Sequence, residues 1–210
     1  MELSRVQAVL LDMDGTLVDS DGAVERSWRT FAAEYRVDPS RGPLSVPGLP
    51  AAGNVRRLRP DLSQDEVAAA AQRQLELEYV DVADVTAAPG AHGLLAELDR
   101  LGLPWAVVTS ADVRLAQIRL AAAGITPALL VTIDDVRRGK PDPEGYLLAA
   151  RKLGADPRRC LVVEDAEAGV AAGRAAGAVV AGLRGVDADI QIADLHQLTE
   201  LLDQAENPRA

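Results

Sequence analysis

The sequence predicts an α/β protein with a Rossmann-like, doubly wound parallel sheet and a small helical cap domain inserted after the first strand. Three observations predict this fold. Short apolar runs alternate with amphipathic segments of helix length, and a glycine follows each of the four helical segments between residues 91 and 176. The alternation is interrupted once, by a long stretch that shows helical patterns and no strand pattern.

Five apolar runs are expected to be strands, because each is short, rich in Val, Leu and Ala, and followed by turn or cap residues. They are Val6–Leu11, Trp105–Val108, Leu129–Ile133, Leu161–Val163 and Ala178–Ala181. Continuous apolar runs of this kind are typical of parallel strands that are buried on both faces. Cys160, the only cysteine, begins one of the runs and is expected to be a core residue, so no intrachain disulfide is possible.

Four amphipathic helices are expected between and after these strands. They are Ala91–Leu101, Val113–Ala123, Pro143–Leu153 and Ala166–Ala176. The glycines that follow them are Gly102, Gly124, Gly154 and Gly177. Glycine is favoured directly after a helix, because the chain there commonly turns through a left-handed conformation. The repeated unit of strand, helix and glycine predicts a sheet with helices on its faces.

The interval between the first strand and Pro89 contains helical patterns only. They cover Gly22–Arg36, Ala51–Leu58 and Gln64–Val82. A structureless loop of that length is unusual in a compact domain, so an inserted helical domain explains the interval better. We place the core domain at residues 1–19 and 87–210 and the cap domain at residues 20–86.

Composition narrows the class of partner. The chain has 210 residues, 48% of them hydrophobic, and a formal net charge of -10. An acidic surface disfavours nucleic acid and anionic membranes. No apolar stretch is long enough to span a membrane, and Glu2 and Asp12 lie too early for a signal peptide. We expect a cytoplasmic protein that binds a small molecule, as a monomer or small homo-oligomer, since no heptad or exposed strand specifies an assembly.

Paired carboxylates follow the first strand, in the segment Asp12-Met13-Asp14-Gly15-Thr16. Ligands of open α/β sheets bind at the carboxyl ends of the strands, so this position is typical of a functional site. The alternative is an acidic turn in which Asp14 and Gly15 only shape the loop. The position at the end of the first strand favours the functional interpretation.

Three later strand ends carry matching polar groups. Thr109 and Ser110 precede a helix, where they could bind an anion or simply cap the helix. Lys140 is one of two lysines in a chain that otherwise uses arginine, which favours a compact point charge over a solvated turn. Glu164 and Asp165 add a second acidic pair, for which a helix cap is the alternative.

Together these segments bring up to four carboxylates to one edge of the sheet. Such a cluster is unfavourable unless a cation is bound there. Ligand sets made only of oxygen select a hard ion, and Mg²⁺ accepts one or two carboxylates together with a substrate phosphate. The sequence therefore predicts a Mg²⁺ site at this edge of the sheet.

The same residues resemble the four motifs of the haloacid dehalogenase (HAD) superfamily phosphatases in order and spacing. DMDGTLVDS, PWAVVTS, RGKPDPEGYLLAA and CLVVEDAEAGVAAG extend the resemblance over nearly the whole chain. They are similar to the subgroup with a helical cap after the first strand, which contains sugar-phosphate and glycerol-phosphate phosphatases and β-phosphoglucomutase. The likeness is greatest to bacterial sugar-phosphate phosphatases. Dehalogenases lack a carboxylate at the position of Asp14, so the resemblance implies phosphoryl transfer.

The resemblance also implies residue roles. Asp12 would attack phosphorus and form an aspartyl-phosphate, and Asp14 would act first as an acid and then as a base. Thr109, Ser110 and Lys140 would hold the phosphoryl oxygens. Mg²⁺ would be ligated by Asp12, Asp165 and the main-chain carbonyl of Asp14, with Glu164 as a direct or water-mediated ligand. The Lys140–Pro141 peptide bond is expected to be cis.

The cap matches the family less closely, so it leaves the substrate open. Related phosphatases often carry polar or basic residues before the second cap helix, where this chain reads Val46-Pro47-Gly48-Leu49-Pro50. Candidate substrate-binding residues are Gly48, Asn54 and Arg56, with Arg57 as a further option. The aromatic residues Trp28, Phe31 and Tyr35 recur at helical spacing and favour a cap core over a sugar platform.

These observations predict a Mg²⁺-dependent phosphomonoesterase for a small phosphorylated sugar, polyol or glycerol-like metabolite. A phosphomutase of the β-phosphoglucomutase type is the main alternative. Its cap-side histidine corresponds to Val24 here, which counts against it. A phospho-accepting signalling receiver module is a more distant alternative. Receivers are shorter and accept the phosphoryl group on their middle strand, whereas this chain has its paired aspartates after the first strand and an inserted cap.

Overall fold

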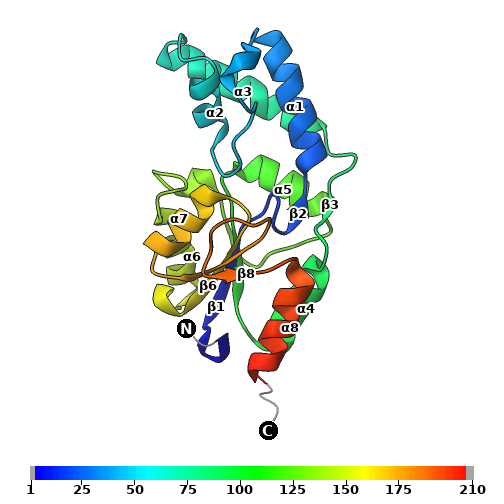
Figure 1. Ribbon diagram of the computed structural model, residues 1–210, viewed down its shortest axis with the longest axis vertical. Coiled ribbons are helices and arrows are strands. Elements are labelled where there is room, and N and C mark those ends of the chain that lie inside the picture. Colours follow the sequence, from blue (N-terminus) through cyan, green and yellow to red (C-terminus); the bar gives the residue numbers. More distant parts are fainter. Residues whose placement is uncertain (1–2, 207–210) are drawn as a thin grey trace.

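The computed structural model describes residues 3–206, and a six-stranded parallel sheet lies at its centre (Figure 1). The strands are ordered β5-β4-β1-β6-β7-β8, so β1 lies between β4 and β6. Their bounds are Ala8–Leu11 (β1), Trp105–Val108 (β4), Leu130–Val131 (β5), Cys160–Glu164 (β6), Val179–Gly182 (β7) and Ile190–Gln191 (β8). The predicted α/β fold with a doubly wound parallel sheet is confirmed.

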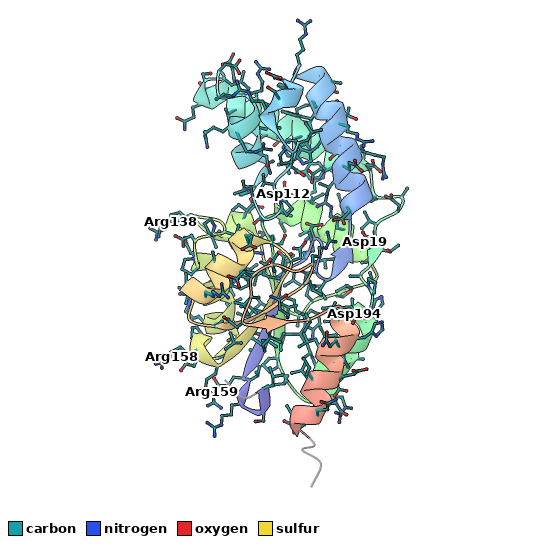
Figure 2. All side chains as sticks on the ribbon, in the orientation of Figure 1. Asp19, Asp112, Arg138, Arg158, Arg159 and Asp194 are labelled. Carbon is teal, nitrogen blue, oxygen red and sulfur yellow. The ribbon has the colours of Figure 1, made fainter. Side chains whose placement is uncertain are left out.

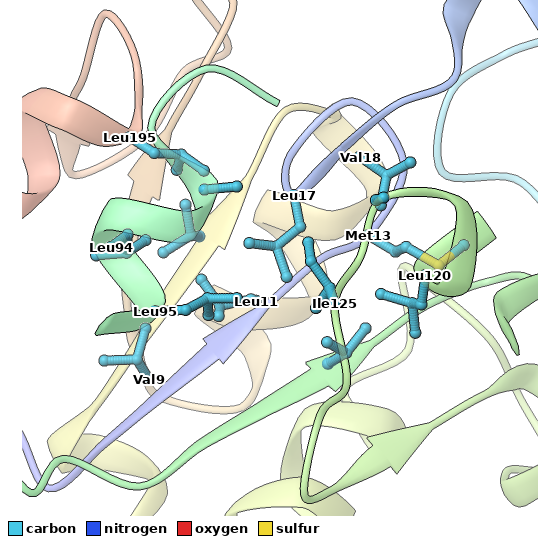
Figure 3. Packing of buried hydrophobic residues seen from close by; sticks show 14 of the residues in the cluster. Val9, Leu11, Met13, Leu17, Val18, Leu94, Leu95, Leu120, Ile125 and Leu195 are labelled. Atoms are coloured by element: carbon cyan, nitrogen blue, oxygen red, sulfur yellow. The ribbon is translucent and has the colours of Figure 1, made fainter. Parts of the chain in front are cut away.

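Helices cover both faces of the sheet. Their bounds are Ala91–Arg100 (α4), Val113–Ala122 (α5), Glu144–Leu153 (α6), Glu167–Ala175 (α7) and Leu195–Glu206 (α8). The side chains of β1 alternate between the two faces, with Val9 and Leu11 in the core under α4, α5 and α8. Ala8 and Leu10 belong to the core under α6 and α7. Figure 3 shows the first of these cores, with Val9 and Leu11 of β1 beside Leu95 of α4.

This arrangement creates a crevice between β1 and β6. The chain leaves β1 toward the face covered by α4 and α5, whereas it leaves β6 toward α7 on the opposite face. Ligands of doubly wound sheets bind where the connections diverge in this way, outside the carboxyl ends of the strands. The two acidic pairs predicted from the sequence follow these two strands.

A separate group of three helices lies beyond the carboxyl ends of the strands (Figure 1). Their bounds are Asp21–Glu34 (α1), Ala51–Leu58 (α2) and Gln64–Val80 (α3). They share a core that includes Trp28 and Phe31, with Tyr35 packed against it, as the aromatic spacing suggested. The ring of Phe31 stacks on that of Tyr35 at 4.3 Å. We propose that residues 20–86 form the cap domain and that residues 1–19 and 87–210 form the core.

Two chain crossings connect the cap to the core. β2 (Val18–Asp19) and β3 (Thr86–Ala87) pair antiparallel at this junction. Nearby, Arg26 of α1 makes two-pronged ion pairs with Asp81 and Asp84. The entry and the exit of the cap are therefore held side by side. Figure 2 shows Asp112 near the level at which the cap helices approach the core, with Arg158 and Arg159 at the far end of the molecule.

Several elements were not predicted because they are very short. The strands β2, β3 and β8 have two residues each, too few for a hydrophobic pattern to register. The run predicted at Leu129–Ile133 is strand only at Leu130–Val131 and continues as a 3-10 helix at Ile133–Asp135. The other 3-10 helices are Leu3–Arg5, Pro39–Arg41 and Pro157–Arg159. Among the described residues, no helix is long and apolar enough to cross a membrane.

Candidate active site

Asp12 lies at the centre of the sheet edge, directly after β1. Its amide donates a hydrogen bond to the carbonyl of Val163 at 3.0 Å, which continues the pairing of β1 with β6. The loop that follows turns at Gly15, whose φ of 81° favours glycine. A Cβ on Gly15 would lie 2.0 Å from Oδ2 of Asp165. Glycine therefore lets the first loop approach Asp165 closely, and the two acidic strand ends meet.

Lys140 is buried beneath this loop and follows the 3-10 helix that succeeds β5. Its Nζ donates to Oδ1 of Asp12 and to the carbonyl of Val108 at 3.0 Å, and lies 2.7 Å from Oε1 of Glu164. Burial lowers the pKa of Lys140, but the carboxylates of Asp12 and Glu164 raise it by a larger amount. The pKa of Lys140 therefore lies above its usual value. The ammonium is charged at neutral pH. The Lys140–Pro141 bond is cis, as the family resemblance implied.

Glu164 ends β6 and is almost fully buried. Its Oε1 contacts Lys140 and also accepts a hydrogen bond from the hydroxyl of Tyr146 at 2.5 Å. Its Oε2 accepts a bond from the amide of Asp165 at 3.3 Å. A Cβ on Gly169 of α7 would lie 1.8 Å from Oε1, so glycine leaves the space that this carboxylate fills. With Oε1 engaged by two donors, Glu164 holds Lys140 in place beside Asp12.

Asp12, Glu164 and Asp165 each offer a carboxylate oxygen within 4.8 Å of the others. Burial and then the charge of Glu164 raise the pKa of Asp12, and the same two causes raise the pKa of Asp165 to about 7. Both shifts mean that burial and mutual repulsion disfavour the charged carboxylates, and that Lys140, together with Arg184 at Asp165, offsets this only in part. A set of three oxygen ligands with excess negative charge fits a hard divalent ion. The residues are therefore suited to Mg²⁺.

Asp14 points away from this cluster. Its Oδ1 accepts a hydrogen bond from Ser20 Oγ at 2.7 Å and lies 2.9 Å from a terminal guanidinium nitrogen of Arg119 in α5. Ser20 precedes α1 but makes no capping bond with its side chain. The first loop therefore gives the two carboxylates different partners, with Asp12 bound to Lys140 and Asp14 bound to Arg119.

Thr109 and Ser110 follow β4, next to Asp12 across the sheet. The amide of Thr109 donates to the carbonyl of Val131 at 2.9 Å, and its Oγ1 accepts from the amide of Ala111 at 3.0 Å. The hydroxyl of Ser110 donates to the carbonyl of Gly48 in the cap at 2.9 Å. Both residues line the same cavity as Asp12. Their hydroxyls are thus fixed by the local loop and by the cap.

A cavity of about 520 Å³ separates the sheet edge from the cap. Its core side includes Asp12, Asp14, Thr109, Ser110 and Asp165, and its cap side includes Val24, Glu25, Trp28, Arg29 and Ser45. Pockets of this size typically hold small metabolites. Lys140 and Glu164 are not among the lining residues, because they lie beneath Asp12. All seven core residues singled out from the sequence are brought to one place.

The three cap candidates have different positions. Gly48 lines the cavity and approaches Ser110. Asn54 also lines it, but its side chain is buried and bonded to the main chain of Val46 and Leu49, so it holds the loop. Arg56 is exposed on α2 and is not among the lining residues. Of the three candidates, Gly48 and Asn54 therefore line the cavity and stay predicted substrate-binding residues, whereas Arg56 lies outside its lining.

Sequence reasoning missed four residues of the site. Tyr146 and Arg119 contact Glu164 and Asp14, and Glu78 of α3 contacts Arg119. Arg184 follows β7; its Nε lies 3.5 Å from Asp165 and its terminal nitrogen 2.8 Å from Asp21 of the cap. Tyr146 lies in the segment RGKPDPEGYLLAA but was given no role there, and the other three lie outside the quoted segments. Tyr146, Arg119 and Glu78 are buried positions inside helices, and burial is not visible in one sequence, whereas Arg184 lies in the exposed loop after β7.

The raised pKa of Asp165 predicts how metal-free protein responds to pH. The pKa of Asp165 is about 7 in the folded state and ~3.9 in the unfolded state. At pH values between these two, the folded state binds the proton more tightly than the unfolded state does. This contribution to stability is fully present below the unfolded value and is lost as pH rises through about 7. We expect melting temperatures in EDTA to fall by a few degrees between about pH 5 and pH 8. Ion pairs lower the pKa of surface carboxylates such as Asp61, which titrate below this window.

Asp165→Asn is the control for this pH effect, because the amide does not titrate. The slope of melting temperature against pH should flatten in the variant. Saturating Mg²⁺ should reverse the slope in the unmodified protein, since metal binds the deprotonated ligand. Equal slopes in EDTA for both proteins would contradict the assignment to Asp165.

Comparison with known proteins identifies the family. The model for haloacid dehalogenase-like hydrolases matches residues 6–177. Hexitol phosphatase A of Escherichia coli (strain K12) is 42% identical over 174 residues, covering 82% of this chain and 81% of that protein. Validoxylamine A 7'-phosphate phosphatase of Streptomyces hygroscopicus subsp. limoneus is 32% identical over 211 residues, covering 91% of this chain and 95% of that protein.

A solved structure agrees with these matches. A hydrolase from Pseudomonas syringae superposes with a TM-score of 0.84 at 29% identity, covering 94% of this chain and 98% of that chain. The family match includes the four motifs from Asp12 to Asp165. The predicted enzyme class, a phosphatase of this superfamily, is confirmed by these comparisons. The chain belongs to the haloacid dehalogenase-like hydrolases.

Proposed function

We propose that this protein is a Mg²⁺-dependent phosphomonoesterase that acts on a small phosphorylated sugar, polyol or glycerol-like metabolite. The observation that carries the proposal is the buried contact of Lys140 with Asp12 and Glu164, beside Asp165 and beneath the cavity floor that Asp12 forms. One ammonium and three carboxylates form a site that a metal ion and a phosphate would complete.

Asp12 is the nucleophile in this proposal. Lys140 fixes Oδ1, so the carboxylate is held at the cavity floor in one orientation. Attack of Asp12 on phosphorus forms an aspartyl-phosphate while the bond to the leaving oxygen breaks. Asp12 and Asp165 would hold Mg²⁺, which would neutralise charge on these carboxylates and on the phosphate oxygens. Lys140 and the strand-end residues Thr109 and Ser110 support the phosphoryl group as charge moves within it.

Asp14 supplies the proton chemistry. In the first step it protonates the leaving oxygen, and in the second it takes a proton from the water that hydrolyses the aspartyl-phosphate. Its position at the cavity wall, two residues after the nucleophile, suits a group that meets the leaving oxygen rather than the metal. The different partners of the two aspartates, Lys140 for Asp12 and Arg119 for Asp14, support this division of roles.

The cavity and the relatives support the substrate class. The named relatives act on a hexitol phosphate and on validoxylamine A 7'-phosphate, as their names state. Polar side chains on the cap side include Glu25, Arg29 and Ser45, which can bind hydroxyl groups. Trp28 and Leu44 supply apolar surface beside them. A hydroxylated carbon chain would meet both kinds of surface in this cavity.

The phosphomutase alternative is less well supported. Val24 lines the cavity at the position where the resemblance would place a mutase histidine. The two histidines, His92 in α4 and His196 in α8, are not among the described residues that line the cavity. A phosphomutase transfers a phosphoryl group between two positions of a sugar, and it needs a cap-side group that moves a proton of the sugar hydroxyl. We infer hydrolysis as the outcome, and keep cytoplasmic location and a monomer or small oligomer as expectations.

A substrate panel tests the proposal. Phosphate release is measured from hexitol, hexose, pentose, glycerol and nucleotide monophosphates, with Mg²⁺ and with EDTA. We expect hydrolysis of polyol or sugar phosphates, loss of activity in EDTA, and no isomerised sugar phosphate by chromatography. Full activity in EDTA after exhaustive metal removal, or an isomerised product that depends on a bisphosphate primer, would contradict the proposal.

A further inference from the structure

Arg119 is a buried cation that the proposed mechanism does not yet use. It belongs to α5 on the core, and only 3% of its side chain is exposed. Its two terminal nitrogens contact carboxylates from distant parts of the chain. One lies 2.9 Å from Oδ1 of Asp14, and the other donates to Oε2 of Glu78 in cap helix α3 at 2.9 Å. The guanidinium thus bridges the active site and the cap.

The polar contacts continue into the cap from Glu78. Gln74, one turn earlier on α3, donates to Oε1 of Glu78 at 2.9 Å and lies 3.0 Å from Ser27 Oγ of α1. Ser27 in turn donates to the carbonyl of Val24, which lines the cavity. A continuous buried chain of polar groups therefore runs from Asp14 to the interior of the cap.

Stability alone does not account for this chain. Buried ion pairs contribute little net stability, and apolar side chains of similar size often replace them without loss. Nε of Arg119 and Oε1 of Gln74 are buried without a hydrogen-bond partner, which adds a further cost. In addition, α3 contacts the start of α5 through Tyr79. The hydroxyl of Tyr79 donates to Asp112, and the guanidinium carbon of Arg114 lies 4.2 Å from the centre of the Tyr79 ring. The cap has another anchor nearby.

The contacts of Asp14 indicate what the bridge does. Both described contacts, from Ser20 and from Arg119, go to Oδ1. A carboxylic acid can accept hydrogen bonds on its carbonyl oxygen while its other oxygen carries and donates the proton. Fixing Oδ1 therefore leaves Oδ2 as the oxygen that exchanges a proton with the leaving group. Two donors on one oxygen also stop the carboxyl group from rotating.

We propose that Arg119 is a positioning residue that orients Asp14 for proton transfer, and that Glu78 makes this orientation depend on the docked cap. The inference rests on the proposed function, since it assigns the acid role to Asp14. In the first step the proton leaves Oδ2 for the departing oxygen as the bond between Asp12 and phosphorus forms. The new carboxylate on Asp14 is then stabilised by the charge of Arg119.

The orientation of Arg119 depends on the position of the cap through Glu78. Asp14 of the core contacts one terminal nitrogen of the guanidinium, and Glu78 of α3 contacts the other. With the cap docked, both terminal nitrogens are engaged and the direction of Asp14 is fixed. With Glu78 displaced, Arg119 keeps only the contact to Asp14 and can turn. Proton transfer would then be efficient only after the cap has covered the substrate and excluded water.

The test compares leaving groups, since a general acid matters only for a poor one. Sorbitol 6-phosphate leaves as an alkoxide that needs a proton, whereas p-nitrophenyl phosphate leaves as a stable phenolate. Rapid quench measures the rate at which the protein becomes phosphorylated by each probe. Asp14→Asn is the reference. Arg119→Met removes the positioning contact, and Arg119→Lys keeps the charge.

We expect Arg119→Met to slow phosphorylation by sorbitol 6-phosphate at least ~30-fold more than phosphorylation by p-nitrophenyl phosphate, a fraction of a full general-acid effect. Arg119→Lys should recover part of this selectivity, and Glu78→Gln should show a smaller selective loss. KM for either probe should change little. Tyr79→Phe is the matched control, because it removes a bond at the same junction between α3 and α5 without touching Asp14.

The outcomes separate the inference from the proposed function. If Asp14→Asn slows the two probes equally, Asp14 is not the acid and both ideas fail. If Asp14→Asn is selective but Arg119→Met and Arg119→Lys slow both probes alike, Arg119 has only a structural role and the inference alone is wrong. Tyr79→Phe showing the same selectivity as Arg119→Met would also overturn it, because general loosening of the cap would then explain the effect.

Discussion

Asp12→Asn should abolish turnover, with a loss of at least about 10⁴-fold in kcat, or ~5 kcal/mol of activation free energy. The substitution keeps the size of the side chain and changes its chemistry. An amide is neither a nucleophile for phosphorus nor a strong ligand for Mg²⁺. Acid-quenched unmodified protein should carry a phosphoryl group on the peptide that contains Asp12, and the variant should carry none.

The stability of this variant should move in the opposite direction from its activity. Burial and the charge of Glu164 raise the pKa of Asp12 well above its usual value, so the folded metal-free protein disfavours the carboxylate there. Replacing it by a neutral amide removes that penalty, while Lys140 keeps Glu164 and the carbonyl of Val108 as partners. We expect an equal or higher melting temperature in EDTA, which is a common trade between function and stability.

Arg137→Gln is a suitable control for Asp12→Asn, because it removes an exposed charge from the loop that precedes Lys140. Its activity should stay close to that of the unmodified protein. The prediction is wrong if Asp12→Asn retains more than about 1% of the activity in freshly purified protein with the same metal requirement. Such a result would point to direct attack by water.

The parts of the site that follow strand ends could be predicted from the sequence. Asp12 and Glu164 stand at the end of apolar runs, and parallel strands carry whatever follows them to one edge of the sheet. Lys140 was recognisable because lysine is rare in this chain. These signals are local in sequence, so no knowledge of packing was needed to read them.

The supporting residues could not be found in this way. Tyr146 and Arg119 point into the site from helices whose facing side is set by tertiary packing. Glu78 reaches Arg119 only because the cap folds over the core, a contact between residues 41 positions apart. Asn54 lines the cavity, and its side chain also bonds to Val46 and Leu49 of the cap loop, so its contact with substrate stays a prediction. Polar residues at a cavity wall have both uses, and only the contacts distinguish them.

Gly15→Ala should reduce kcat/KM by roughly 10² to 10³-fold and weaken the response to Mg²⁺, because a misplacement of about 1 Å in an active site costs on the order of 10²-fold. The added Cβ would lie 2.0 Å from Oδ2 and 2.7 Å from Cγ of Asp165, so that carboxylate has to move. It is held in place by the strand end of β6 and by the approach of Arg184. The shift would fall on a proposed metal ligand.

Gly42→Ala separates this contact from backbone strain. Gly42 has a φ of 85°, close to the 81° of Gly15, and a Cβ there would meet nothing within 4 Å. Both substitutions therefore force alanine to a positive φ, at a cost on the order of 1–3 kcal/mol, but only Gly15→Ala displaces a carboxylate. Activity titrated against Mg²⁺ should be nearly normal for Gly42→Ala and shifted to higher Mg²⁺ for Gly15→Ala. Similar losses in both variants would mean that strain alone disables the loop, and that the close approach to Asp165 does not define the metal site.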